Sequence, residues 1–134
     1  MRVDRLSNPL NVVVYAGESL ADAANRMRFN DVGCAPVLDK GQLVGILTER
    51  DLTRAIADCA DAGGVEVADY MTPEPVIVAP GTTVEMAAEI MVNAGVRHLP
   101  VVDRGQLVGV LSIRDVVNDR VWSLYDVAVA KAES

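Results

Sequence analysis

One segment of this sequence occurs twice. Residues 3–54 align with residues 67–118 without a gap, and 20 of the 52 aligned positions are identical. The longest match sets Gly41-Gln-Leu-Val-Gly-Ile-Leu47 against Gly105-Gln-Leu-Val-Gly-Val-Leu111. Self-similarity of this kind marks a duplicated structural unit. Because the two copies take up most of the 134 residues, the fold must be built from two similar halves.

Each copy contains the same series of predicted elements. Runs rich in valine predict short strands, and apolar residues at i, i+3, i+4 and i+7 predict a helix with one apolar face. A hydroxyl residue followed three positions later by an acid, Ser19 to Asp22 and Thr82 to Glu85, predicts where this helix begins. The predicted strands are 12–15, 35–38 and 43–47 in the first copy and 76–79, 99–102 and 107–111 in the second, with second helices from Thr48 and Ser112.

The predicted fold class is therefore α/β (α+β), with two β-α-β-β-α repeats. We expect the first repeat over residues 1–60 and the second over 65–120, joined by an acidic connector at 58–69. A sheet this small with two helices cannot cover its own apolar face, so we expect the repeats to pack about a pseudo-twofold axis. Apolar spacing predicts a last helix over 116–130 that continues into a helical tail at 121–134. This helix either closes the fold or contacts a second copy or a partner.

The charge of the chain excludes some classes of partner. Twelve basic against nineteen acidic residues give a net charge of −7, which repels nucleic-acid phosphates and anionic lipids. No apolar run approaches the roughly 18 residues that span a bilayer. Two cysteines, Cys34 and Cys59, are too few for a disulfide framework and indicate a reducing compartment. We therefore expect a cytoplasmic protein without a nucleic-acid or membrane partner.

Two aligned motifs are the candidates for binding. Thr48-Glu-Arg-Asp51 and Ser112-Ile-Arg-Asp115 each follow a strand and open a helix. One interpretation is structural, because a hydroxyl and an acid three residues later cap a helix. The other is functional, because a helix start attracts an anion and an Asp accepts hydrogen bonds from ribose hydroxyls. Gly45 and Gly109, in the preceding strands, allow either a ligand or backbone to approach or a helix to pack tightly.

Taken together, these features resemble a tandem pair of cystathionine-β-synthase-type (CBS) domains, the arrangement called a Bateman module. The matching residues are Asp69-Tyr-Met-Thr-Pro73 entering the second copy, Val96-Arg-His-Leu-Pro-Val-Val-Asp103 and both Thr/Ser-x-x-Asp endings. The resemblance covers about residues 3–120. It implies a regulatory pair of domains that binds adenosine-containing ligands in two clefts between the domains. It also implies a homodimer in the form of a flat, four-domain disc.

The resemblance assigns roles to individual residues. It implies ribose contacts by Asp51 and Asp115, phosphates near Thr48 and Ser112, a basic pair at Arg97 and His98, and adenine bordered by Val12, Val13, Val76 and Ile77. Arg50 and Arg114 either assist the phosphates or remain solvated, and His98 is alternatively a partly buried polar residue. Where the second copy has Arg97 and His98, the first has Gly33 and Cys34. We therefore expect one cleft to carry most of the nucleotide affinity, and Cys34 to be a small buried residue.

The sequence offers no set of catalytic groups. It has neither a Gly-x-x-x-x-Gly-Lys-Ser/Thr loop nor a Gly-x-Ser-x-Gly elbow, and Asp51 and Asp115 are duplicates of each other rather than an acid–base pair. No Cys or His has a second ligand at metal-binding spacing. We expect a stand-alone sensor that is not an enzyme, holds no metal, and takes AMP, or else ADP or ATP, as regulatory ligand. It would signal to a separate protein partner. The alternative is a ligand-free interaction scaffold or dimerisation module.

Overall fold

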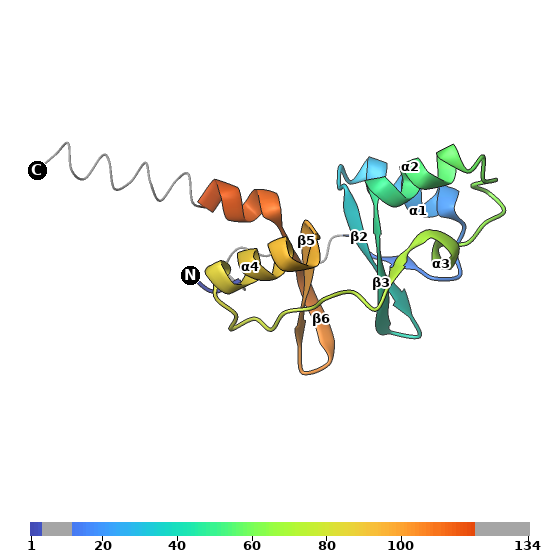
Figure 1. The fold of residues 1–134 in the computed structure, drawn as a ribbon. Helices are drawn as coiled ribbons and strands as arrows, with labels where there is room; N and C mark the ends of the chain where they lie inside the picture. The colour runs from blue at the N-terminus through green and yellow to red at the C-terminus, as the bar shows by residue number, and fades with distance from the viewer. Residues whose placement is uncertain (4–11, 120–134) are drawn as a thin grey trace, which may run out of the picture. The chain divides into compact units, whose positions relative to one another are not determined.

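The computed structural model describes residues 1–3 and 12–119 of the chain (Figure 1). The chain forms two compact units. The first unit is Leu10–Val76, and the second unit is Ile77–Ser134 together with Met1–Pro9. Each unit contains most of one copy of the repeat.

The first unit is a four-stranded sheet with helices. Its strands lie in the order β1-β2-β3-β4, with β1 parallel to β2 and the other pairs antiparallel. The elements in chain order are β1 (Val14–Tyr15), α1 (Leu20–Phe29), β2 (Cys34–Asp39), β3 (Gln42–Thr48), α2 (Glu49–Ala57), α3 (Val67–Tyr70) and β4 (Thr72–Pro73).

The second unit repeats the central part of this plan. It contains α4 (Val84–Ala94) and the antiparallel pair β5 (His98–Asp103) and β6 (Gln106–Ser112), followed by a helix whose described part is 113–119. This helix is the second helix that was predicted from Ser112. The predicted last helix over 116–130 overlaps it only as far as residue 119, and the tail at 121–134 lies outside the described residues. Within the described part, no helix is long and apolar enough to cross a membrane.

The predicted first strands are shorter than expected in both units. Residues 12–15 give the two-residue β1, and residues 76–79 give a single parallel bridge from Val78 to Val101. In the first unit the pairing continues when the Ala16 N–H donates to the Leu38 carbonyl at 3.1 Å. The second copy has Pro80 at this position. Because proline has no N–H, the corresponding bond cannot form, and the strand ends early.

The first helices begin at aligned residues. As predicted, Ser19 caps α1 and accepts a hydrogen bond from the Asp22 N–H at 3.1 Å. The prediction for the second copy is wrong by one position, because Thr83 caps α4 and accepts from the Met86 N–H at 3.2 Å. Thr82 instead presents its carbonyl to the Val3 N–H at 2.9 Å.

Each unit is completed by the first residues of the other copy and the residues just before them. In the first unit, the N–H of Leu20 donates to the Val65 carbonyl, and β4 pairs with β3. In the second unit, the N–H of Val84 donates to the Met1 carbonyl at 2.9 Å. The segment Asp69–Pro73, expected to enter the second copy, therefore folds onto the first. The compact units divide the chain at other positions than the sequence repeat does.

The predicted apolar faces form the two cores. α1 buries Leu20, Ala23 and Met27 in the first unit, and α4 buries the aligned Val84, Ala87 and Met91 in the second. Residues 65–73 and residues 1–3, which complete the first and second units, each add one fully buried valine to the core: Val67 in the first unit and Val3 in the second. Burying one such side chain stabilises a fold by about 1.5–3 kcal/mol, so these segments are integral parts of the units.

Candidate functional site

Thr48 and Asp51 form a reciprocal cap at the start of α2. The Thr48 N–H donates to Asp51 Oδ2 at 2.9 Å, and the Thr48 hydroxyl donates to the same oxygen at 3.1 Å. In return, the Asp51 N–H donates to Thr48 Oγ1 at 3.4 Å. Asp51 is 3% exposed and is the buried charged residue of the described part of the chain. The structural interpretation of this motif is therefore correct in the first unit.

Ser112 and Asp115 form the same cap in the second unit. Asp115 Oδ2 accepts from the Ser112 N–H at 3.0 Å and from the Ser112 hydroxyl at 2.8 Å, and the Asp115 N–H donates back at 3.2 Å. Unlike Asp51, Asp115 is only half-buried. Both caps engage the carboxylate through one oxygen, Oδ2.

The second unit brings the predicted basic pair beside its cap. In the β5–β6 ladder, His98 lies opposite Ser112, and the Ile113 N–H donates to the Arg97 carbonyl at 2.8 Å. Arg97 is exposed and His98 is half-buried. One end of this unit thus combines a helix start, a carboxylate, a hydroxyl and two basic side chains. The exposed Arg114 follows on the first turn of the helix.

The first unit presents different chemistry at the same place. Cys34 lies opposite Thr48, and the Glu49 N–H donates to the Gly33 carbonyl at 3.0 Å. The Glu49 side chain lies so close to Gly33 that a Cβ at this residue would be 2.9 Å from Glu49 Oε1. Burial and the charge of Asp51 raise the pKa of the Cys34 thiol to about 12, which keeps the thiol neutral. This end of the first unit therefore carries the carboxylates of Glu49 and Asp51 and has no counterpart of the Arg97–His98 pair. The exposed cation of the Thr48–Asp51 motif is Arg50.

The residues predicted to border adenine differ in exposure. Val12 is 7% exposed and packs in the core of the first unit, whereas the aligned Val76 is 44% exposed. Val13 is half-buried and Ile77 is 49% exposed. Val76 ends the first unit, and Ile77 begins the second.

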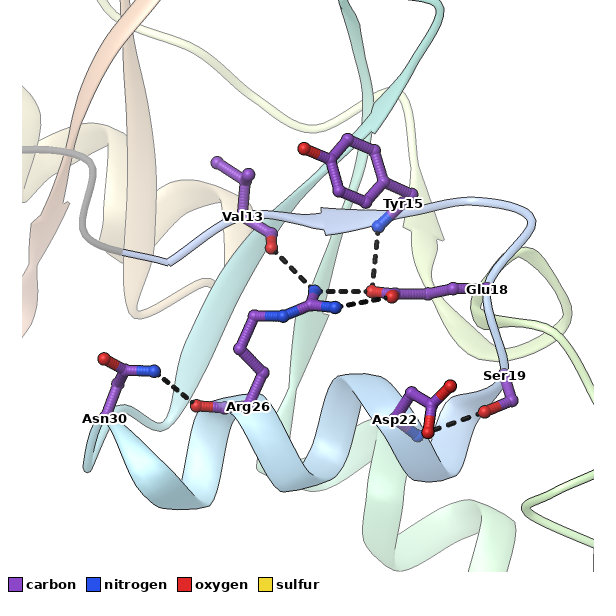
Figure 2. A network of polar contacts seen from close by, with 7 residues as sticks. All are labelled: Val13, Tyr15, Glu18, Ser19, Asp22, Arg26 and Asn30. Atoms are coloured by element: carbon purple, nitrogen blue, oxygen red, sulfur yellow. Dashed lines mark hydrogen bonds and ion pairs between the residues drawn. The ribbon is translucent and has the colours of Figure 1, made fainter.

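A charged network that sequence reasoning missed fixes the backbone around Val13 (Figure 2). Arg26 donates two hydrogen bonds of 2.7 Å to the Glu18 carboxylate and one of 2.9 Å to the Val13 carbonyl. Glu18 also accepts from the Tyr15 N–H at 3.1 Å. The aligned residues in the second copy are Thr82 and Ile90, so the pair belongs to the first unit alone. Glu18 and Arg26 are eight residues apart, which is not the spacing of a helical ion pair, so no sequence pattern indicated this contact.

The ion pair changes the acidity of both partners. Burial by itself would raise the pKa of Glu18, but the hydrogen bonds from Arg26 and Tyr15 and the charge of Arg26 together lower it below its ordinary value of 4.5. The hydrogen bonds to Glu18 and the negative charge of its carboxylate raise the pKa of Arg26. Glu18 is therefore held as a carboxylate.

A second missed network surrounds Asp51. Arg54 Nη2 lies 3.6 Å from Asp51 Oδ1 and donates to the Tyr70 carbonyl at 2.7 Å. The guanidinium also lies over the Tyr70 ring, 5.6 Å from its centre, and the Tyr70 hydroxyl donates to Asp58 at 3.0 Å. These contacts tie α2 to α3.

Gly45 allows a strand to approach. A Cβ at this residue would lie 2.6 Å from Met71 Sδ and 2.8 Å from the Thr72 carbonyl. Of the interpretations that the sequence left open at Gly45, close approach of backbone is the one observed, because β4 pairs here. A hollow between α1 and α2, with Arg28, Asp31 and Glu49 among its lining residues, contains none of the predicted binding residues.

Comparison with known proteins identifies the family. A model of the CBS domain matches residues 5–58 and again residues 67–120. The chain belongs to the CBS domain family. The prediction of a tandem CBS pair with an α/β fold is thus confirmed.

The CBS pair has relatives of different length. It is 40% identical over 107 residues to the uncharacterized protein MJ1225 of Methanocaldococcus jannaschii, an alignment that covers 79% of this chain and 38% of that protein. It is 32% identical over 103 residues to the CBS domain-containing protein YhcV of Bacillus subtilis, covering 77% of this chain and 74% of YhcV. An inosine-5'-monophosphate dehydrogenase of Korarchaeum cryptofilum is 34% identical over 106 residues, which are 78% of this chain and 21% of that enzyme. Similar CBS pairs therefore occur both in small proteins and as minor parts of longer ones.

Solved structures share the fold over nearly the whole chain. The CBS domain protein NE2398 superimposes with a TM-score of 0.83 at 31% identity and covers 90% of this chain and 98% of its own. CBSX2 of Arabidopsis thaliana, solved in complex with AMP, has a TM-score of 0.79 at 31% identity, covering 90% and 96%. PAE2072 of Pyrobaculum aerophilum, also complexed with AMP, has a TM-score of 0.75 at 33% identity, covering 86% and 89%.

Proposed function

We propose that this CBS pair is a regulatory protein that binds an adenine nucleotide, with AMP as first candidate, and signals to a protein partner. The observation that carries the proposal is the arrangement at one end of the second unit, where Arg97 and His98 lie beside the Ser112–Asp115 cap. The AMP complexes of CBSX2 and PAE2072 support the choice of ligand.

The chemistry of this end fits a nucleotide. The N–H groups of a helix start attract a phosphate, and Arg97 offers it a planar set of charged donors. Ser112 contributes a hydroxyl, and a carboxylate such as Asp115 accepts hydrogen bonds from neighbouring ribose hydroxyls. In the first unit, Glu49 lies beside the cap where the second unit has the neutral Ile113. We therefore expect the phosphate to be held mainly by the second unit.

The proposed signal is a shift between two conformations. A ligand changes such an equilibrium only by binding one state more tightly than the other. A partner that recognises the same state must then raise the affinity for AMP, since the coupling is reciprocal. We expect a cytoplasmic homodimer that does not itself catalyse a reaction; the two free thiols, Cys34 and Cys59, are consistent with a reducing compartment.

Thermal unfolding with a panel of nucleotides tests the proposal. AMP, ADP, ATP, S-adenosylmethionine and GMP are compared at equal concentration, and calorimetry follows for any ligand that stabilises the chain. A ligand at about 100 times its Kd stabilises by about 2.7 kcal/mol, which raises the Tm of a domain of this size by several degrees. A selective rise with one adenine nucleotide supports the proposal. An unchanged Tm with every nucleotide contradicts it.

Exposed apolar side chains favour a second candidate, a scaffold for protein contacts. Phe29 on α1 is 91% exposed, Ile56 on α2 is 78% exposed and Val92 on α4 is 77% exposed. Large apolar residues left in water are typical of interaction surfaces when they gather into patches. If the protein is a scaffold, Asp51 and Asp115 serve only as helix caps. The nucleotide panel then gives no response, while substitution of Phe29 and Ile56 by Ser changes the oligomeric state measured by light scattering.

A further inference from the structure

Residues 1–3 belong to the second unit, although the first unit separates them from the rest of it along the chain. We propose that these residues form a strap that couples the stability of the two units. While the strap is docked, both ends of the first unit are tied to the second. An event that lifts the strap off the second unit is thereby transmitted to the first. The device is independent of the proposed function and acts with or without a ligand.

The strap is held at the start of α4 by backbone hydrogen bonds and one buried side chain. The Val3 N–H donates to the Thr82 carbonyl at 2.9 Å, and the Val84 N–H donates to the Met1 carbonyl at 2.9 Å. The Val3 side chain is 0% exposed and lies in the core of the second unit. Three residues thus combine a backbone pairing with an apolar anchor.

The chain returns to the second unit close to the strap. Val78 is 5% exposed in the same core, and its N–H forms a hydrogen bond of 3.0 Å with a carbonyl of β5. Because Thr82 is only four residues further along, Val3 and Val78 lie within about 20 Å of each other. Docking of the strap therefore closes residues 4–77, which include the whole first unit, into a loop with both ends held.

The closed loop restricts the unfolded form of the first unit. An unfolded segment of this length spans on the order of 45 Å between its ends. Holding the ends within about 20 Å lowers the entropy of the unfolded segment and makes unfolding less favourable, as a covalent cross-link does.

The size of the coupling follows from these lengths. The volume open to the free end of the unfolded segment is larger by a factor of about ten when the strap is released. Release should therefore raise the unfolding equilibrium constant of the first unit about tenfold. By linkage, a folded first unit favours docking of the strap by the same factor.

Amide hydrogen exchange of the full chain tests the proposal with Val3→Asp, which places a charge at the buried anchor of the strap. We expect fast exchange at the Val84 N–H, which reports release of the strap, and slow exchange in β5 and β6, which reports a folded second unit. The β2 and β3 amides of the first unit should then exchange about tenfold faster than in wild type. Val117→Asp makes the same substitution at an exposed position of the second unit, and its exchange should equal wild type.

A removable cross-link supplies a second test. Arg2 forms an antiparallel bridge with Thr83, so the pair Arg2→Cys and Thr83→Cys, in a Cys59→Ser background, can hold the strap in place as a disulfide when combined with Val3→Asp. We expect the oxidised form to restore wild-type exchange in β2 and β3. The reduced form carries the same substitutions and should exchange fast there.

Two results overturn the proposal. One is a fast Val84 N–H together with wild-type rates in β2 and β3, and the other is equal β2 and β3 rates in the oxidised and reduced forms. If Val3→Asp unfolds the second unit, Val3→Thr replaces it in both tests, because threonine keeps the shape of valine and adds one hydroxyl.

Discussion

The first and second units are built from two copies of one repeated sequence, yet they carry their charged side chains at different positions. In the first unit, three charged side chains make contacts within the unit: Glu18, Arg26 and Arg54. The aligned residues of the second copy are Thr82, Ile90 and Asn118. In the second unit, Arg97 and His98 stand at a helix start where the first has Gly33 and Cys34. In the function that we propose, the two copies divide their tasks: the charges of the first copy stabilise its unit, and Arg97 of the second copy contacts the ligand.

The largest expected effect separates the two carboxylates. Asp115→Asn preserves an oxygen for the cap but removes the negative charge that we propose accepts hydrogen bonds from the ribose. We therefore expect AMP affinity to fall about 10- to 100-fold, as for hydrogen bonds to a charged group. Asp51→Asn is the matched variant and should change AMP affinity less than twofold. Calorimetric titration of both variants measures this. Equal losses in the two variants would remove the proposed difference between the units.

Gly45→Ala tests how closely a strand approaches in the first unit. The added Cβ would meet Met71 Sδ at 2.6 Å and the backbone carbonyl of Thr72 at 2.8 Å, so β4 has to shift, and we expect a loss of about 1–3 kcal/mol in the free energy of unfolding. Gly33→Ala is the control, because its Cβ would meet only the end of the flexible Glu49 side chain. Urea denaturation compares the two variants, and equal stability would show that β4 does not depend on Gly45.

Arg26→Met tests the network that the second unit lacks. The substitution leaves the mostly buried Glu18 carboxylate without its cation. We expect a loss of about 1–2 kcal/mol, below the value for a fully buried pair because Arg26 is 36% exposed. Arg28→Met, an exposed position on the same helix, should change stability by less than about 0.5 kcal/mol. Indistinguishable urea midpoints for the two variants would contradict the role given to the pair.

The smallest expected effect is a pH dependence. Because the pKa of Glu18 is lowered in the folded state, protonation favours the unfolded chain. The stabilisation that ionised Glu18 contributes is complete above its ordinary pKa of 4.5. It is lost as the pH falls through the lower pKa that Glu18 has in the folded state. The difference in stability between wild type and Glu18→Gln should therefore stay constant from pH 7 to about 5 and shrink below about 4.5. Chemical denaturation at each pH measures it, and a difference that grows on acidification would be the opposite result.

Much of the candidate site could be predicted from local patterns. The spacing of Thr48 and Asp51, and of Ser112 and Asp115, indicated caps that the structure contains. The capping prediction failed only at Thr82. Two neighbouring threonines offered alternative helix starts, and the carbonyl of the first one accepts a hydrogen bond from the Val3 N–H. The partners of Arg26 and Arg54 could not be predicted, since neither contact follows a helical or strand repeat.

By itself, the sequence determined the repeat, the apolar faces of α1 and α4, and the paired strands β2–β3 and β5–β6, because each depends on residues that are neighbours along the chain. Only the tertiary structure decided that residues 65–73 complete the first unit, that Glu18 reaches Arg26, and that Arg54 joins Asp51 to Tyr70. The physical reason is that periodicity shows which face of an element is apolar but not what covers it. Partners distant along the chain are selected by packing, as at Gly45, where only the absence of a side chain lets β4 enter the sheet.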